Sequence, residues 1–195
     1  AQGGFPVPEA LLVGADAYRA FARGADLRAA GALSVTEPEA LRRECESLRA
    51  TLVATPFPPE VDRELRAALA DLVGRAGSVS VRSSATLEDL AGGAFAGQHD
   101  TFLGVRGLDA VMDAIRRCYA SLWEDRAVRY RHELGFAPDA ADMAVVVQTM
   151  VQADAAGVAF SMSPITGQTD RVLVTSAFGL GETVVSGDGE VDQFI

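Results

Sequence analysis

The chain has 195 residues, of which 49% are apolar, so it is long enough for one domain or two small ones and apolar enough for a buried core. No apolar run approaches the roughly 20 residues that span a bilayer, and no signal-peptide pattern opens the sequence, so we expect neither a membrane protein nor a secreted one. The net charge of −10 argues against non-specific nucleic-acid binding. All 17 basic residues are arginines, which excludes any mechanism that needs a lysine of this chain.

The first part of the chain, about 1–77, is predicted to be helical. After an extended, proline-fixed start at 5–8, helices are expected at 15–23, from a capping box at 36–39 to the prolines at 56–59, and at 59–74. The apolar side chains expected to face inward are Tyr18 and Phe21 in the first helix, Leu41, Cys45, Leu48 and Leu52 in the second, and Val61, Leu65, Ala68, Leu69 and Leu72 in the third.

The second part, about 78–195, is predicted to be rich in strands. Alternating or valine-rich runs predict strands at 78–82, 100–105, 144–151, 157–162 and 171–177. Between the second and third of these, an apolar stripe predicts a helical region, which a capping box at 121–124 divides into two helices. The fold class that follows is α+β, with helices first and then a largely antiparallel sheet.

The two cysteines predict no disulfide. Cys45 and Cys118 lie far apart in the sequence, each on the apolar face of a helical pattern. We therefore expect buried free thiols and a reducing, cytoplasmic setting.

A polar stretch at 81–107 suggests a phosphate site. Arg82 ends an apolar strand, and Ser83, Ser84 and Thr86 follow with hydroxyl groups, a combination that suits an anion with several oxygens. The glycines at 92–97 would let the backbone approach a ligand closely. An exposed hairpin with a serine-capped start remains the alternative, and no GxxxxGK[ST] loop is present.

Two further segments suit other parts of a nucleotide. The valine-rich strand at 145–151 could offer backbone groups to an adenine edge and side chains to its ring, although a plain core strand explains it too. At 176–182 a strand meets two glycines and then Glu182, whose carboxylate could accept hydrogen bonds from ribose hydroxyls. A strand corner bent by glycine is the alternative for that segment.

Together these segments resemble the N-terminal ATP-binding domain shared by phosphoenolpyruvate synthase, pyruvate phosphate dikinase and rifampicin phosphotransferase, which has the ATP-grasp fold. The resemblance covers almost the whole chain. It is carried by VRSSAT at 81–86, FAGQ at 95–98 with DTFL at 100–103, ASLWEDRAVRYR at 120–131, VVVQTMV at 145–151, GVAFSMSPITG at 157–167 and SAFGLGETVVSG at 176–187.

The resemblance implies a role for each matching residue. Arg82 would clamp the ATP phosphates and stabilise charge in the transition state, which makes it the candidate catalytic residue, and Ser83 would supply a hydroxyl beside it. The other implied ATP-binding residues are Phe95, Ala96, Gly97 and Gln98 in a mobile flap over the phosphates, Thr101 near the nucleotide, Gln148, Met150 and Val151 around the adenine, and Glu182 at the ribose.

The implied reaction uses ATP and Mg²⁺. In this family the β-phosphoryl group of ATP passes to a histidine on another domain, and from there to an acceptor such as pyruvate, with release of AMP and phosphate. The expected partners are therefore a phosphohistidine domain and an acceptor-binding domain of the same protein. His99 and His132 do not match the phosphorylated histidine and are expected to be structural or solvated.

The chain also departs from the family pattern. The family's phosphate-binding lysine is missing, and the resemblance places its magnesium ligands beyond Ile195, so we expect an incomplete ATP-binding domain that is inactive alone. Two other hypotheses stay open. One is rifampicin phosphotransferase, which inactivates an antibiotic, and the other is a nucleotide-binding module without turnover, which the missing lysine favours.

Overall fold

The computed structural model describes residues 4, 6–25, 27, 33–85, 100–137, 139–163, 166–186 and 190–194. The chain forms two compact units: unit 1 is Ala1–Met150 and unit 2 is Val151–Ile195.

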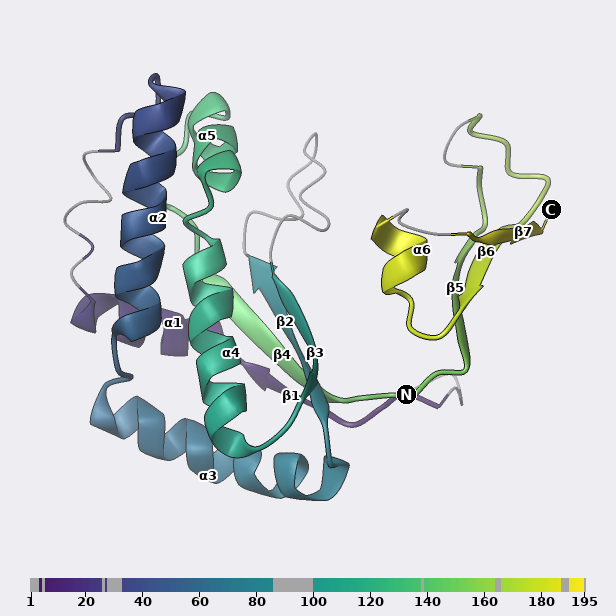
Figure 1. Ribbon diagram of the computed structural model, residues 1–195, viewed down its shortest axis with the longest axis horizontal. Coiled ribbons are helices and arrows are strands. Elements are labelled where there is room, and N and C mark those ends of the chain that lie inside the picture. The colour runs from purple at the N-terminus through teal and green to yellow at the C-terminus, as the bar shows by residue number, and fades with distance from the viewer. Residues whose placement is uncertain are drawn as a thin grey trace. The chain divides into compact units, whose positions relative to one another are not determined.

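Unit 1 is an antiparallel four-stranded sheet with helices packed against one face (Figure 1). The strands lie in the order β1 (Ala10–Val13), β4 (Met143–Thr149), β2 (Val79–Ala85) and β3 (Thr101–Val105). The helices are α1 (Ala15–Gly24), α2 (Pro38–Ala54), α3 (Pro59–Ala76), α4 (Leu108–Ser121) and α5 (Asp125–Glu133). Within the described ranges, no helix is both long and apolar enough to cross a membrane.

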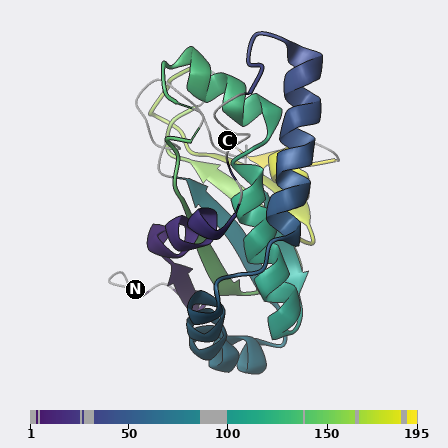
Figure 2. The same cartoon turned by 90° about the vertical axis from the view of Figure 1, so that its left-hand side faces the viewer.

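The core of unit 1 lies between the helices and the sheet. Successive side chains of a strand point to opposite faces, and Val79, Val81, Val145 and Val147, all fully buried, point toward the helices. They join one apolar cluster with α1, α3 and α4, in which the ring of Tyr119 contacts three other aromatic rings. Seen from the side of the helices in Figure 2, α1 and α4 lie in front of the strands.

Unit 2 is a smaller antiparallel sheet with one short helix. Its strands lie in the order β5 (Ala155–Phe160), β6 (Leu173–Phe178) and β7 (Asp192–Phe194), and α6 (Glu182–Ser186) follows β6. The turn between β6 and α6 contains Gly179, whose φ of 82° favours glycine, and the Gly179 amide donates a hydrogen bond to the Asp154 carbonyl at 2.8 Å.

The predicted α+β class with antiparallel sheets is confirmed, and so are the main helices. The inward-facing residues of α1 and α2 are those that their spacing predicted. In α3, however, Ala68 is exposed and Val73 is buried in its stead. The strand β1 at Ala10–Val13, the strand β7 and the helix α6 were not predicted.

Both predictions of a capping box are wrong, but the two helices that these boxes were expected to start are present. The N-cap of α2 is Glu37 and that of α5 is Glu124, and neither helix start has a side-chain cap. Pro38 occupies the first turn of α2, where its fixed φ suits a helix start. Ser121 belongs to the last turn of α4, and its hydroxyl donates to the Cys118 carbonyl at 2.7 Å.

Cys45 and Cys118 are buried free thiols, as predicted. Burial raises the pKa of Cys45 to about 11 and that of Cys118 to about 12, because an apolar environment disfavours the thiolate. Both thiols are therefore protonated at neutral pH and chemically inert while the chain is folded. His132 lies exposed on α5, as expected, and His99 lies outside the described residues.

Gly157 leads to the first testable prediction, since unit 2 has no room for a side chain there. A Cβ at this position would lie 2.7 Å from the Thr175 carbonyl oxygen and 3.1 Å from the Ser176 Cβ on the neighbouring strand. We expect Gly157→Ala to destabilise unit 2 by about 1–3 kcal/mol. Hydrogen exchange of the β5 and β6 amides measures the effect.

The matched control is Gly181→Ala, whose methyl group would lie an ordinary 3.6 Å from the Ala156 Cβ. It should leave the exchange rates of β5 and β6 unchanged. Equal protection of these strands in both variants would contradict the steric argument.

Candidate functional site

The candidate site is the sheet face of unit 1 that points away from the core, which we call the open face. Arg82, Val146 and Leu12 follow or precede buried residues in their strands and therefore point to this face. Strand register places four side chains in one row across it. In order across the sheet, the row is Leu12 on β1, Val146 on β4, Arg82 on β2 and Thr101 on β3.

Arg82 was predicted to end its strand, and this placement is wrong. β2 continues to Ala85, and it is an inner strand with β4 on one side and β3 on the other. The strand continues because Ser83, Ser84 and Ala85 still pair with β4. Arg82 therefore stands near the middle of the open face, where its side chain is exposed.

Arg82 differs electrostatically from many arginines of the helices. Arg19, Arg66 and Arg75 each pair with two carboxylates. Among the residues that the structure describes, no carboxylate forms an ion pair with Arg82. An exposed guanidinium that forms no ion pair with a described carboxylate, in a chain of net charge −10, is suited to an external anion.

The hydroxyl groups near Arg82 fall into two kinds, those exposed on the open face and one that is bonded within the fold. Thr101 stands directly opposite Arg82 and is exposed, and Ser84 is exposed two residues further along β2. Ser83 points to the other face. Its hydroxyl donates to the Asp100 carbonyl at 3.0 Å and its amide to the same oxygen at 3.4 Å, so Ser83 fixes the start of β3.

The residues predicted around adenine lie at or after the end of β4. The Gln148 side-chain amide donates to the Pro8 carbonyl at 3.4 Å, which ties it to the segment before β1. The Met150 amide donates to the Ser78 carbonyl at 3.0 Å. A contact from Met150 to adenine would therefore have to use its side chain or its carbonyl oxygen, so the predicted adenine frame stays a prediction.

The other predicted residues belong to unit 2 or lie outside the described residues. Val151, which is exposed, and Glu182, the exposed first residue of α6, belong to unit 2. Thr86 and the predicted flap residues, Phe95, Ala96, Gly97 and Gln98, lie outside the described residues.

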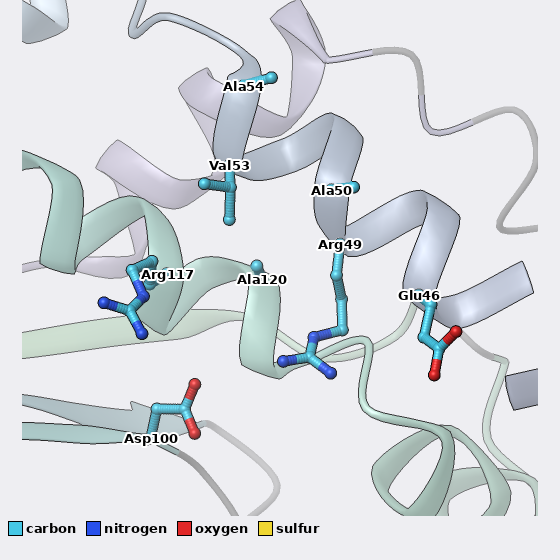
Figure 3. Close-up of a pocket in the computed structure, with 8 residues that line it drawn as sticks. All are labelled: Glu46, Arg49, Ala50, Val53, Ala54, Asp100, Arg117 and Ala120. Atoms are coloured by element: carbon cyan, nitrogen blue, oxygen red, sulfur yellow. The ribbon is translucent and has the colours of Figure 1, made fainter. Parts of the chain in front are cut away.

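A separate groove of about 500 Å³ lies on the helix side of unit 1 (Figure 3). It is lined by α2, α4 and Asp100, and Figure 3 shows Arg49 and Arg117 on either side of Ala120. The Arg49 guanidinium pairs with Glu124 at 2.9 Å, and that of Arg117 stacks on the Phe102 ring at 4.3 Å. No predicted nucleotide-binding residue lines this groove.

Sequence reasoning did not mark Leu12, and it treated Val146 only as part of the valine-rich strand at 145–151. Both residues share the open face with Arg82. The run ALLV at 10–13 is apolar enough to suggest a strand, but four residues are too few for alternation to show which side chains face outward.

Within the described part of the chain, no three His, Cys, Asp or Glu side chains gather in a way that could hold a metal ion.

Comparison with known proteins relates this chain to a nucleotide-binding family. The family described as "Pyruvate phosphate dikinase, AMP/ATP-binding domain" matches residues 1–195. The chain belongs to this family. The predicted resemblance is therefore confirmed, and with it the ATP-grasp type of fold.

Relatives of this dikinase-family chain are much longer proteins. The phosphoenolpyruvate synthase of Neisseria meningitidis is 42% identical over 98% of this chain, and that of Aeropyrum pernix is 38% identical over 100%, each covered over 25% of its own length. The "Prodigiosin synthesizing transferase PigC" of Serratia marcescens is 41% identical over 98% of this chain and is covered over 20% of its length. The chain thus spans a fifth to a quarter of these relatives.

The contacts of Ser83 predict a stabilising role for its hydroxyl in this dikinase-family domain. Ser83→Ala removes a half-buried hydrogen bond to the Asp100 carbonyl, so the free energy of unfolding should fall by about 1 kcal/mol. The adjacent Ser84→Ala is the matched control, because Ser84 is exposed, and it should change stability by less than about 0.5 kcal/mol. Urea unfolding measures both, and equal effects would show that Ser83 does not anchor β3.

Proposed function

We propose that the open face of unit 1 holds the phosphates of ATP, with Arg82 as the principal cation. The observation that carries the proposal is the exposed guanidinium of Arg82 on an inner strand, opposite the Thr101 hydroxyl and without an ion-pair partner among the described residues. Membership of the AMP/ATP-binding family supports a nucleotide as the anion. The flap residues at 95–98, the adenine frame at 148–151 and Glu182 at the ribose remain parts of this proposal.

The residues of this face suit polyphosphate chemistry. A guanidinium offers several N–H donors in one plane and stays charged at any physiological pH, so it can hold oxygens of adjacent phosphates. Because negative charge is redistributed over the phosphate oxygens during transfer, a positioned cation stabilises the transition state as well as the bound nucleotide. The Thr101 hydroxyl can donate a further hydrogen bond to a phosphate oxygen.

We further propose that the chain is the ATP-binding part of a dikinase-type phosphotransferase. In the proposed reaction, the bond between the α- and β-phosphates breaks to release AMP, and a histidine nitrogen of another domain takes the β-phosphoryl group. Water attacks the γ-phosphorus and breaks the bond between the β- and γ-phosphates, which releases inorganic phosphate, and the phosphohistidine then passes its phosphoryl group to an acceptor. The names of relatives that are phosphoenolpyruvate synthases favour pyruvate as that acceptor. Mg²⁺ would neutralise phosphate charge, and no group of residues within the described ranges is assigned to it.

Two alternatives to this function stay open. One differs in the phosphoryl acceptor, and the other has no catalytic turnover. Rifampicin phosphotransferase would use the same ATP chemistry with an antibiotic hydroxyl as acceptor. A nucleotide-binding module without turnover is favoured by one specific observation, the absence of any lysine among the cations of this chain.

The reaction is tested by product analysis of the full gene product. Incubation with ATP and magnesium should yield AMP and phosphate in equal amounts, and pyruvate should increase the yield. Chromatography of the nucleotides measures AMP. ADP as the product would contradict a dikinase reaction, and tight ATP binding without any AMP would identify a non-catalytic module.

Arg82→Ala is the corresponding test of the site. Loss of a charge-assisted contact of roughly 1.5–3 kcal/mol should raise the Kd for ATP by about 10- to 150-fold. The melting temperature should stay unchanged, because the side chain is exposed and has no ion-pair partner among the described residues. Calorimetric titration with ATP measures the Kd, and Arg63→Ala, at an exposed arginine of α3, is the matched control. Equal affinities of the two variants would show that Arg82 does not hold the phosphates.

A further inference from the structure

The start of β3 connects the open face of unit 1 with its helix side. Thr101 pairs with Arg82 and points with it to the open face. Because side chains alternate along a strand, the next residue, Phe102, points to the opposite side, where it packs against the apolar core. Asp100, just before the strand, lines the groove on the same helix side. Any contact that holds Asp100 and Phe102 therefore also helps to fix Thr101.

The backbone alone holds the start of β3 weakly. β3 is an edge strand, and β2 is its one partner among the described strands. The register shifts within this ladder, where two residues of β3 lie opposite one of β2, so the regular pairs at the start of β3 are Val81–Phe102 and Arg82–Thr101. Two regular pairs on an edge strand give little resistance to local opening, so side-chain contacts have to contribute.

Arg117 of α4 supplies such contacts from the helix side. Its guanidinium carbon lies 4.3 Å from the centre of the Phe102 ring, within the range of a cation–π interaction. Arg117 and Asp100 both line the groove, and Figure 3 shows the Arg117 guanidinium at the end of the groove where the Asp100 carboxylate lies. The two side chains carry opposite charges and attract each other. Arg117 thus acts on both neighbours of Thr101.

The helix that carries Arg117 is itself well fixed. Cys118, Tyr119 and Ala120, which follow it in α4, are buried in the core of unit 1. The Arg117 side chain therefore extends from a rigid support to a strand that is held less firmly. Its contacts complement those of Ser83, which bonds the Asp100 carbonyl and so holds the backbone before Thr101.

We propose that Arg117 is a positioning residue, which holds the start of β3 so that the Thr101 hydroxyl stays beside Arg82. The inference rests on the proposed function, since it takes Arg82 and Thr101 to contact phosphate. It adds a residue on the opposite side of the sheet, which acts on the phosphate site through Phe102 and Asp100 and does not touch the ligand.

The test measures the order of β3 and the binding of ATP separately, on the full gene product. In Arg117→Ala, hydrogen exchange of the β3 amides should become about two- to five-fold faster, because an exposed cation–π contact is lost. Exchange of the inner strand β4 should stay as in the wild type. The Kd for ATP, measured calorimetrically, should rise at least about two-fold, and no further than it rises in Thr101→Ala, since Arg117 acts through Thr101.

Arg116→Ala is the matched control, because Arg116 precedes Arg117 in α4 and its guanidinium also faces an aromatic ring. That ring is Phe57, which is not part of β3, at 5.4 Å. Arg116→Ala should leave both the exchange of β3 and the Kd for ATP unchanged. Arg117→Lys, which keeps a cation that can reach the ring, should restore most of the wild-type affinity. Arg117→Met keeps an apolar side chain of similar length without the charge and should not restore it.

The deciding comparison is made in the Thr101→Ala protein, where adding Arg117→Ala should cause no further loss of ATP affinity. A further loss as large as that in the wild-type background would mean that Arg117 does not act through Thr101, and it would overturn the inference. Unchanged exchange of β3 or an unchanged Kd in Arg117→Ala would overturn it as well, while leaving the proposed function intact. Failure of the wild-type protein to bind ATP would refute the proposed function, and with it the role of Arg117 at the phosphate site.

Discussion

The architecture of unit 1 depends on one-sided burial of its sheet. Val79 and Val81 in β2, and Val145 and Val147 in β4, place every second side chain of the two inner strands in the apolar core. Since side chains alternate along a strand, the intervening positions must point away from the helices. The same pattern that stabilises the core therefore creates the open face. A cation on that face stays exposed to water, so it incurs no desolvation penalty.

The arginines on the helices and Arg82 on the open face have different surroundings. On the helices, many arginines pair with nearby carboxylates, often on the next turn, and such exposed pairs add little stability each. Arg131 is buried, and its pKa falls to about 10 because burial disfavours its charge. On the open face, Arg82 lies among hydroxyl and apolar groups, so in an acidic chain its positive potential is local to the proposed site.

The sequence predicted the structure well where apolar residues recur at fixed spacing along one element. It predicted the structure poorly where side-chain positions depend on pairing between distant strands. The stripe from Leu41 to Leu52 predicted α2 because spacings of three and four are a local property of a helix. Arg82 and its hydroxyl neighbours were predicted to form a phosphate site from residue types alone, and this stays a prediction. That Thr101 and Val146 flank Arg82 could not be predicted, because register is set by contacts between segments far apart in the chain. The four residues of β1 were too few to show alternation.

The position of Arg82 on an inner strand has a consequence for the entropy of binding. β2 is paired on both sides, so the backbone at Arg82 is already ordered before any ligand arrives. A cation on a loop would lose backbone freedom on binding, at roughly 1–2 kcal/mol for each residue fixed, whereas Arg82 has only its side-chain rotamers to lose. For the proposed phosphate site, the sheet would act as a preorganised support, and the flexible side chain of Arg82 would adapt to different phosphate geometries.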